Sequence, residues 1–401
     1  MRSKTKTDCI ISSDKVLAEA QACLIDAKLV KAHGWLCTAA LVAGIVLRAA
    51  ARSISVCAAC RDMAHAPSDQ AILTAVDKGL PKTFPVLEQR LNDCLTAKLP
   101  PRMRHYSWSI AIDYHLQPYY GEPHKRRNEI YYSKPKQGTK KFHAYATACI
   151  VEYGRRYTLA LTWVRGRESM IKVLQRLLAQ IRKIGLKIKH FLLDRAFFTV
   201  AVMQFLQKEN VPYLMPIMFR GRRSKKGRKA TGLRAMRQKP AGWHPYTMKS
   251  REGEVSFQIC VAYRTIRKKD KRTGKKKDKR KSKKLLFAAW GVKDTPTEIR
   301  QLYRRRFGIE TSYRQMRQAR IYTCIRDPRQ RLFFLGVGLL LRNIWVWIHQ
   351  TRLAAGSFSN PTIRLYLLRF KRMLYWIAHE IEALYHDGTP LCVDWQHIPR
   401  T

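Results

Sequence analysis

Helical periodicity dominates the first hundred residues. Apolar side chains recur every three or four positions near the start, at Val16, Leu17, Ala20, Leu24 and Ala27, which is the spacing of one buried helix face. The pattern predicts a more deeply buried helix over Trp35–Ala51 and two short helices over Ile54–Met63 and Asp69–Lys78, the last capped by Ser68. Two short helices across a tight break fit a helix-turn-helix and, equally well, an ordinary helical hairpin.

A period of two replaces the helical period from Tyr106 onward. Trp108, Ile110 and Ile112 alternate with small residues until Asp113, as in a half-buried strand. The pattern predicts further strands at Phe142–Tyr153, Arg156–Val164, Ile188–Leu193 and Tyr213–Ile217, and helices at Ser169–Ile184 and Val200–Lys208. This order predicts an α/β layer built on a mixed sheet, which is the arrangement of a ribonuclease-H-like core.

Residues 218–284 interrupt the pattern with two strongly basic runs. Met218–Lys239 holds ten Lys and Arg and no acid, and Arg264–Lys284 holds fourteen against two aspartates. Val255–Tyr263 alternates as a strand, and Leu285–Trp290 has the composition of its partner. We expect an inserted small sheet with two basic loops, the second disordered when unbound and able to contact phosphates.

The remaining residues return to helices. Thr295–Glu298 has the sequence of a capping box, and the helix that it begins is expected to reach about Arg320. Apolar helices follow at Leu332–Gln350 and Pro361–Tyr385. The chain is thus divided into a helical N-terminal region (1–104), the first part of the α/β core (105–217), a β-rich insertion (218–292), a core helix that carries Glu310 (293–325) and a helical C-terminal region (326–401).

Charge narrows the class of partner. The 401 residues include 78 Lys and Arg against 28 Asp and Glu, which gives a formal net charge of +50. Because the apolar content is that of a folded protein, this field belongs to a structured surface, and such a field concentrates polyanions. Nucleic acid is the expected partner, and an acidic membrane surface is the weaker alternative. The apolar runs are too short or too interrupted to predict a membrane span. Ten scattered cysteines favour a reducing cytoplasm.

Three acids stand out in a chain with so few. Asp113 and Asp194 each follow an apolar strand, so their carboxylates are expected to converge at one edge of the sheet. Glu310 lies on the capped helix, where Tyr303, Arg306, Glu310 and Arg317 fall within an arc of roughly 60°. Carboxylate oxygens are ligands that favour Mg²⁺ or Mn²⁺, so three carboxylates predict a site for such ions. Two of these ions together can promote cleavage of a phosphodiester. Arginines beside such a site can bind the phosphates of the substrate.

The helix face resembles a known signature. Tyr303, Arg306, Glu310 and Arg317 match the Y-R-E-K spacing of prokaryotic insertion-sequence DDE transposases, the insertion-sequence-four-like group, except that Arg317 replaces lysine. Ile110–Asp113 resembles the first-aspartate strand of that family, and Phe191–Phe198 resembles the second. The likeness covers roughly residues 105–350, and the family places an inserted sheet between the second aspartate and the glutamate. The resemblance also implies that the helical residues 1–104 are the DNA-binding domain for the transposon ends, because they occupy the position of that domain in the family, although they carry no matching motif.

The resemblance implies a function and assigns residues to it. It implies Mg²⁺-dependent cleavage at the terminal inverted repeats of the element, followed by joining of the 3′-hydroxyl ends to target DNA. Asp113, Asp194 and Glu310 would be the catalytic metal ligands, and Tyr303, Arg306 and Arg317 would hold phosphates.

Further expectations concern assembly, base contacts and rival functions. Synapsis of two transposon ends would require a homodimer or a larger assembly. The resemblance also makes Trp243 and Trp290 candidates for stacking a flipped base, since some members of the family use a tryptophan of the insertion in this way, although plain packing explains each of them too. One alternative is a catalytically silent, transposase-derived DNA-binding protein. Another is a general RNA-binding protein, but that function would leave the acid-bearing helix face unexplained.

Overall fold

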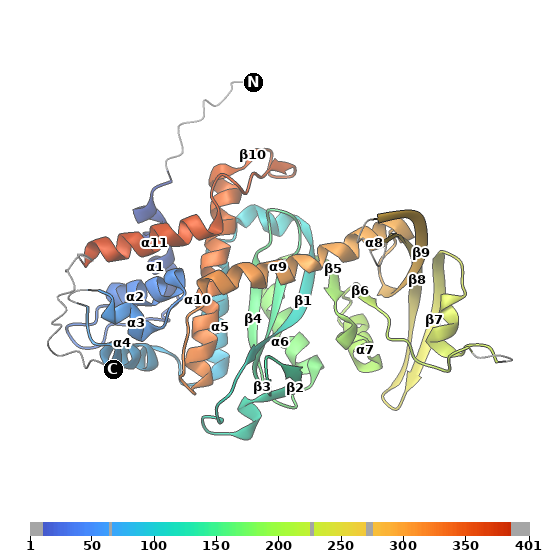
Figure 1. Cartoon of the computed structure of the whole chain (residues 1–401), viewed down its shortest axis with the longest axis horizontal. Helices are drawn as coiled ribbons and strands as arrows, with labels where there is room; N and C mark the ends of the chain where they lie inside the picture. Colours follow the sequence, from blue (N-terminus) through green and yellow to red (C-terminus); the bar gives the residue numbers. More distant parts are fainter. Residues whose placement is uncertain (1–10, 64–65, 225–227, 270–275, 386–401) are drawn as a thin grey trace. The chain divides into compact units, whose positions relative to one another are not determined.

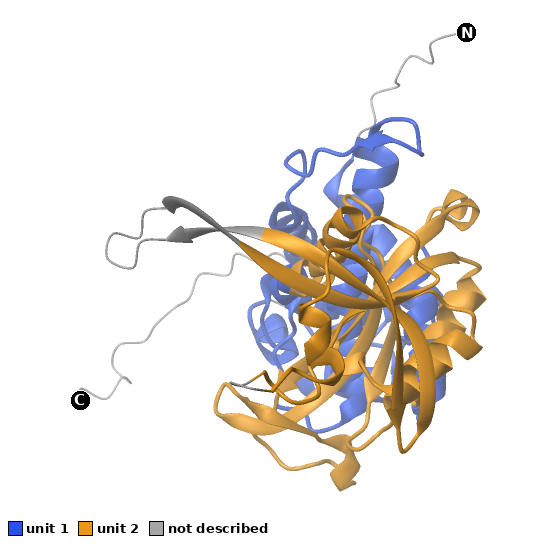
Figure 2. Ribbon diagram, turned by 90° about the vertical axis from the view of Figure 1, so that its right-hand side faces the viewer, with its two compact units in different colours: residues 1–97, 314–401 blue, residues 98–313 orange. Residues whose placement is uncertain are grey.

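The computed structural model describes residues 11–63, 66–224, 228–269 and 276–385. The chain divides into two compact units (Figure 2): residues 1–97 together with 314–401 form one, and residues 98–313 form the other. The first unit is helical, and the second contains the main sheet.

One mixed sheet of nine strands organises residues 98–313 (Figure 1). Its strands are β1 (Ser107–Pro118), β2 (Tyr131–Lys136), β3 (Thr139–Ile150), β4 (Thr158–Val164), β5 (Lys187–Leu193), β6 (Tyr213–Pro216), β7 (Gly242–Ser250), β8 (Gly253–Lys269) and β9 (Lys276–Trp290). They run in the order β2-β3-β1-β5-β6-β9-β8-β7, and β4 pairs with β3. The pairs β1–β5 and β5–β6 are parallel and the others antiparallel.

The helices of this unit connect and cover the strands. They are α6 (Met170–Ile184), α7 (Val200–Lys208), α8 (Pro296–Arg305) and α9 (Phe307–Met316), whose last turn belongs to the other unit. Helix α6 begins at the cap Ser169, whose hydroxyl accepts a hydrogen bond from the Ile171 amide, and ends at Gly185 in the left-handed conformation. Its apolar face is buried and packs on β4 and β3, so burial of that stripe fixes the helix on the sheet.

The other unit packs helices from both ends of the chain. These are α1 (Ser13–Asp26), α2 (Ala39–Arg52), α3 (Val56–Arg61), α4 (Asp69–Gly79), α5 (Phe84–Thr96), α10 (Pro328–Ile348) and α11 (Phe370–Leu384). Helix α11 packs on α1 and α2, where the buried Glu382 carboxylate accepts hydrogen bonds from Arg48 and Arg52. By length and composition Pro328–Leu353 could cross a membrane, but 89% of its most apolar window is buried inside the protein, as in the core helix of a globular unit.

Short elements complete the described chain. They are the 3₁₀ turns η1 (Pro101–His105), η2 (Arg127–Glu129), η3 (Arg195–Phe197), η4 (Gly232–Arg237) and η5 (Arg317–Ala319), the π-helical turn η6 (His349–Leu353), and the paired strands β10 (Ala355–Gly356) and β11 (Pro361–Thr362). The C-terminal helix therefore begins at Phe370 and not at Pro361 as predicted.

The inserted strands correct the prediction of a separate small sheet. Strand β9 pairs with β6, so β7, β8 and β9 extend the main sheet. The second basic run is also not a loop over its described part, because Arg264 to Lys269 pair with Lys276 to Lys283 as a continuation of the β8–β9 hairpin. A backbone ladder does not require apolar side chains, which is why the charge pattern concealed these strands. Residues 270–275 of that run lie outside the described residues.

Two further boundaries differ from the predicted ones. Strand β1 does not end at Asp113 but continues to Pro118, because its antiparallel partner β3 continues beside it. The helix predicted over Thr295–Arg320 has the expected capping box at Thr295 and Glu298 but is interrupted at Arg306, between α8 and α9. The two short N-terminal helices are present as α3 and α4, and residues 64–65 between them lie outside the described residues.

Candidate active site

Strand register brings the two aspartates together. Strand β1 pairs in parallel with β5, and the last pair of that ladder is Ile112 with Leu193. Asp113 follows Ile112 along β1, and Asp194 follows Leu193 after the end of β5. The two aspartates therefore lie side by side where β5 ends and η3 begins. The parallel register of β1 and β5 therefore places both side chains beside the carboxyl end of β5, while β1 itself continues to Pro118. The sequence predicted that these two aspartates converge, although it took both strands to end there.

Two tyrosines fasten the acid-bearing helical segment to these strands. The Tyr303 hydroxyl donates a hydrogen bond to the Leu193 carbonyl at 3.3 Å, directly before Asp194. The Tyr313 hydroxyl donates to the backbone carbonyl of Asp113 at 3.1 Å and lies 2.7 Å from the Thr147 hydroxyl. Because a phenol has one proton, Thr147 donates the second of these bonds. Each aspartate is thus tied through adjacent backbone to the segment that carries Glu310.

Tyr313 is a site residue that the sequence analysis missed. It follows Glu310 by three residues and so shares a helix face with it. Tyr303, Arg306, Glu310 and Tyr313 thus follow one another at intervals of three or four residues, and this spacing could have identified Tyr313 from the sequence. Burial raises the pKa of the Tyr313 phenol far above its usual range, so the hydroxyl keeps its proton and remains a donor.

Removing the Tyr313 hydroxyl tests this fastening. We expect Tyr313→Phe to lower the free energy of unfolding by about 1–3 kcal/mol, since the buried Asp113 carbonyl and Thr147 hydroxyl each lose a partner. Urea denaturation followed by circular dichroism measures the change. The control is Tyr153→Phe, which alters an exposed tyrosine of the same unit. Equal stability of the Tyr313 and Tyr153 variants would contradict a fastening role.

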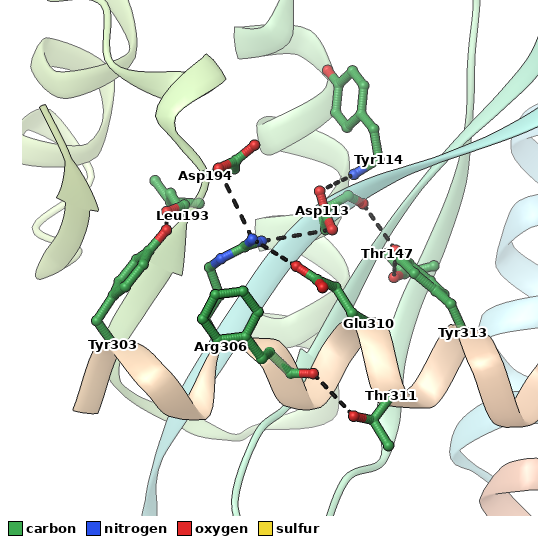
Figure 3. A network of polar contacts seen from close by, with 11 residues as sticks. Asp113, Tyr114, Thr147, Leu193, Asp194, Tyr303, Arg306, Glu310, Thr311 and Tyr313 are labelled. Carbon is green, nitrogen blue, oxygen red and sulfur yellow. Dashed lines mark hydrogen bonds and ion pairs between the residues drawn. The ribbon is translucent and has the colours of Figure 1, made fainter. Parts of the chain in front are cut away.

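Arg306 joins the three acids (Figure 3). Its Nη1 lies 3.6 Å from Asp113 Oδ2, and its Nη2 lies 3.9 Å from Asp194 Oδ1 and 3.0 Å from Glu310 Oε1. The Arg306 side chain is only 7% exposed, while those of Asp113, Asp194 and Glu310 are 21%, 46% and 44% exposed. One buried cation therefore lies within 4 Å of three carboxylates, the first and last of which, Asp113 and Glu310, are 197 positions apart in the sequence (310 − 113).

Burial and charge set the protonation of this cluster. Burial raises the pKa of the Asp113 carboxyl to about 6; the Arg306 guanidinium opposes that rise, and Asp194 and Glu310 add to it. Burial disfavours the charge of Arg306, but Tyr303 and the three carboxylates outweigh it and raise its pKa. Burial likewise raises the pKa of the Tyr303 phenol. At neutral pH Asp113 is therefore mostly ionised, and it faces a guanidinium that keeps its proton.

The donor set suits a hard divalent cation, but the carboxylates do not form a ligand cluster in this conformation. Carboxylate oxygens are the ligands that Mg²⁺ and Mn²⁺ prefer. Among the described residues, however, no three His, Cys, Asp or Glu side chains are grouped closely enough to hold an ion. The expectation that the three acids meet around shared ions is therefore not met here, because they meet on Arg306 instead.

The three residues that were predicted to hold phosphates, Tyr303, Arg306 and Arg317, lie in different surroundings. Tyr303 hydrogen-bonds to backbone and packs on Phe287, with ring centroids 5.0 Å apart. Arg306 is engaged with the acids, so it is not free for a phosphate in this state. Arg317 begins η5 in the other compact unit, and its role stays a prediction.

A basic cavity adjoins Tyr303. It has a volume of about 740 Å³, and its walls include seven Lys and Arg side chains but no acid. Arg195, which follows Asp194 directly, is one of them, and Phe287 and Tyr303 contribute apolar surface. Cationic side chains bind phosphates and aromatic rings stack on bases, so this combination suits the binding of nucleotides.

The two candidate tryptophans are packed. Trp243 on β7 is half-buried and donates its indole N–H to the Asp294 carbonyl at 3.1 Å. Trp290 at the end of β9 is also half-buried and stacks on Tyr213, with ring centroids 6.5 Å apart. Both side chains thus have packing partners, and base stacking by either one stays a prediction.

Comparison with known proteins gives the family. The family model described as the transposase DDE domain matches residues 108–344, a segment that contains all three acids. A chain in the cryo-EM structure of the piggyBac transposase synaptic complex with hairpin DNA has a TM-score of 0.51 and 12% identity, over 93% of this chain and 78% of that one. At this identity the likeness concerns the fold. No curated protein matches. Since the family model covers more than half of the sequence, the chain belongs to the DDE-domain transposases.

Proposed function

We propose that the protein cleaves DNA at the terminal inverted repeats of its own insertion sequence and joins the freed 3′-hydroxyl ends to target DNA. The observation that carries this proposal is the convergence of Asp113, Asp194 and Glu310 on one buried guanidinium at the end of β5. Packing alone does not call for three acids at one point of a chain with a net charge of +50. A centre that handles divalent cations and phosphates does.

Asp113, Asp194 and Glu310 would hold Mg²⁺ or Mn²⁺, with two ions in the active centre. Bound there, the ions would activate a water or 3′-hydroxyl and stabilise the leaving oxygen of a phosphodiester. Burial raises the pKa of Asp113 to about 6, so this ligand would gain a proton as the pH falls through that value. Tyr303 and Tyr313 would keep the helical segment in register with both strands, and Tyr303, Arg306 and Arg317 would hold the DNA phosphates.

The strand order supports a ribonuclease-H-like core. Three antiparallel strands, β4, β3 and β1, are followed across the sheet by the parallel strands β5 and β6. That is the arrangement predicted from the order of the elements, with Asp113 on the first of these strands in chain order and Asp194 directly after the fourth. We propose on the same grounds, with the Tyr303 to Arg317 spacing, that the chain is of the insertion-sequence-four-like group.

Double-stranded DNA is the proposed partner, bound by a homodimer or larger assembly that pairs two ends. The net charge and the acid-free basic cavity beside Tyr303 support DNA binding. The similar piggyBac transposase was determined as a synaptic complex with hairpin DNA, and the present chain is proposed to form a comparable complex.

A catalytically silent DNA-binding protein is the second candidate. The observation that favours it is Arg306 itself, because ion pairs to all three acids could be retained for structure alone. Such a protein would bind DNA without cutting it, so a cleavage assay distinguishes the two functions.

The assay uses the full chain and a supercoiled plasmid that carries both genomic flanks of its gene. We expect strand breaks at the element ends with Mg²⁺ or Mn²⁺, and intact plasmid with EDTA. A plasmid that lacks the flanks serves as the substrate control. Tight binding without any metal-dependent break would support the silent protein and contradict the proposed enzyme.

A further inference from the structure

The hydrogen bonding of Arg306 is poor for a guanidinium so deeply buried. Its only geometrically good contact with the acids is the 3.0 Å hydrogen bond to Glu310. The separations from Asp113 and Asp194 exceed hydrogen-bond length, and within the described part of the chain Nε and Nη1 are buried without a hydrogen-bond partner. Electrostatic attraction therefore holds the group in place more than directional bonding does.

The charges around Arg306 do not balance. With all three acids ionised, three negative charges face one positive charge, which leaves an excess of two. A divalent cation could neutralise that excess, and the same carboxylate oxygens that face Arg306 are the donors it would use. The guanidinium and a divalent ion thus compete for one location.

The backbone at Arg306 offers a means of movement. Arg306 lies between α8 and α9, where the Arg306 amide bonds to the Tyr303 carbonyl and the Ile309 amide bonds to the Arg306 carbonyl, at 3.1 Å and 3.0 Å. Both bonds span three residues, as in a 3₁₀ turn, and such a turn inside a helix commonly marks a hinge. Tyr303 and Tyr313 anchor the two sides of this junction, so Arg306 can move without release of the helical segment.

We propose that Arg306 excludes divalent cations from the active site of the free protein and moves out when a DNA phosphate becomes its partner. Arg306 is then a positioning residue that makes cation loading depend on DNA. The inference rests on the proposed function, because it takes the three acids to be the cation ligands. It adds the order of events: DNA binding comes before full loading of the site.

Mn²⁺ binding, measured by electron paramagnetic resonance without DNA, tests the exclusion. We expect Arg306→Gln to bind Mn²⁺ about tenfold more tightly than wild type, the effect of roughly 1.4 kcal/mol for one opposing charge removed. Arg305→Gln is the matched control, since it removes the same charge from the exposed neighbour, and it should leave the affinity unchanged. An Arg306→Gln affinity equal to or weaker than that of wild type would overturn the proposal.

A second measurement uses the wild-type chain, so it does not depend on how a variant folds. Adding duplex DNA that carries the element end should raise the Mn²⁺ affinity of wild type about tenfold, after subtraction of the signal from Asp194→Asn with the same DNA. An affinity that does not change with DNA would overturn the coupling.

The cleavage assay separates failure of this inference from failure of the proposed function. If wild type cuts DNA but Arg306→Gln binds Mn²⁺ no more tightly, the inference alone fails. If Arg306→Gln gains affinity and Asp194→Asn removes it, while no protein cuts DNA, the cation exchange stands and the enzymatic proposal fails.

Discussion

Asp194→Asn and Glu310→Gln are each expected to abolish strand cleavage, by about 10³-fold or more, while duplex binding stays near that of wild type. A loss of this size corresponds to roughly 4 kcal/mol of transition-state stabilisation, which is reasonable for a ligand whose charge the reaction requires. Both side chains are almost half exposed, so an amide of the same shape should not disturb the fold. Duplex binding should not weaken, because each change removes a negative charge that repels phosphates.

Gel-based cleavage and filter-binding assays on the same preparations measure both quantities. Glu252→Gln is the control, since it neutralises an exposed acid of the same compact unit and should cut normally. Full cleavage by either test variant would exclude that residue from the catalytic centre. Loss of DNA binding together with cleavage would point to misfolding instead.

Asp113→Asn is expected to inactivate the protein and to stabilise its fold at pH 7. Burial raises the pKa of the Asp113 carboxyl from 3.8 to about 6, so the folded state holds the proton more tightly than the unfolded state. The ionised carboxylate therefore destabilises the fold. Below pH 4 the free energy of unfolding is unaffected, between pH 4 and 6 it falls progressively, and above pH 6 it is lower by up to about 3 kcal/mol. Asparagine avoids this cost, although Arg306 loses one partner.

The pH dependence provides the control for this prediction. The stability difference between Asp113→Asn and wild type, from urea denaturation, should be largest at pH 7 and should shrink towards pH 4. A variant that is less stable than wild type at pH 7 would show that the contact with Arg306 outweighs the burial of the carboxylate. Increased stability with lost activity would fit an active site that is kept at a cost in stability.

The sequence predicted the elements that carry the acids because their signals are local. Alternation up to Asp113, the apolar run before Asp194 and the capping box before Tyr303 each depend on a few adjacent residues. The capping box is present as predicted, and Val200–Lys208 forms α7 with the predicted bounds. Local chemistry was also sufficient to assemble Asp113, Asp194 and Glu310 into one candidate site.

What the sequence could not predict depends on distant partners. The continuation of β1 past Asp113 is set by β3, and the merging of the insertion with the main sheet is set by the pairing of β9 with β6. The direction of the Arg306 side chain depends on three acids from three separate segments. A helical wheel places Arg306 on the correct face, but it cannot show that the guanidinium stands among the acids.

Anomalous X-ray diffraction from crystals grown with Mn²⁺ and duplex DNA tests the central claim most directly. The account predicts manganese bound by carboxylate oxygens of Asp113, Asp194 and Glu310 together, with the Arg306 guanidinium turned from them towards a phosphate. Manganese bound elsewhere, or Arg306 still paired with all three acids while cleavage proceeds, would contradict it.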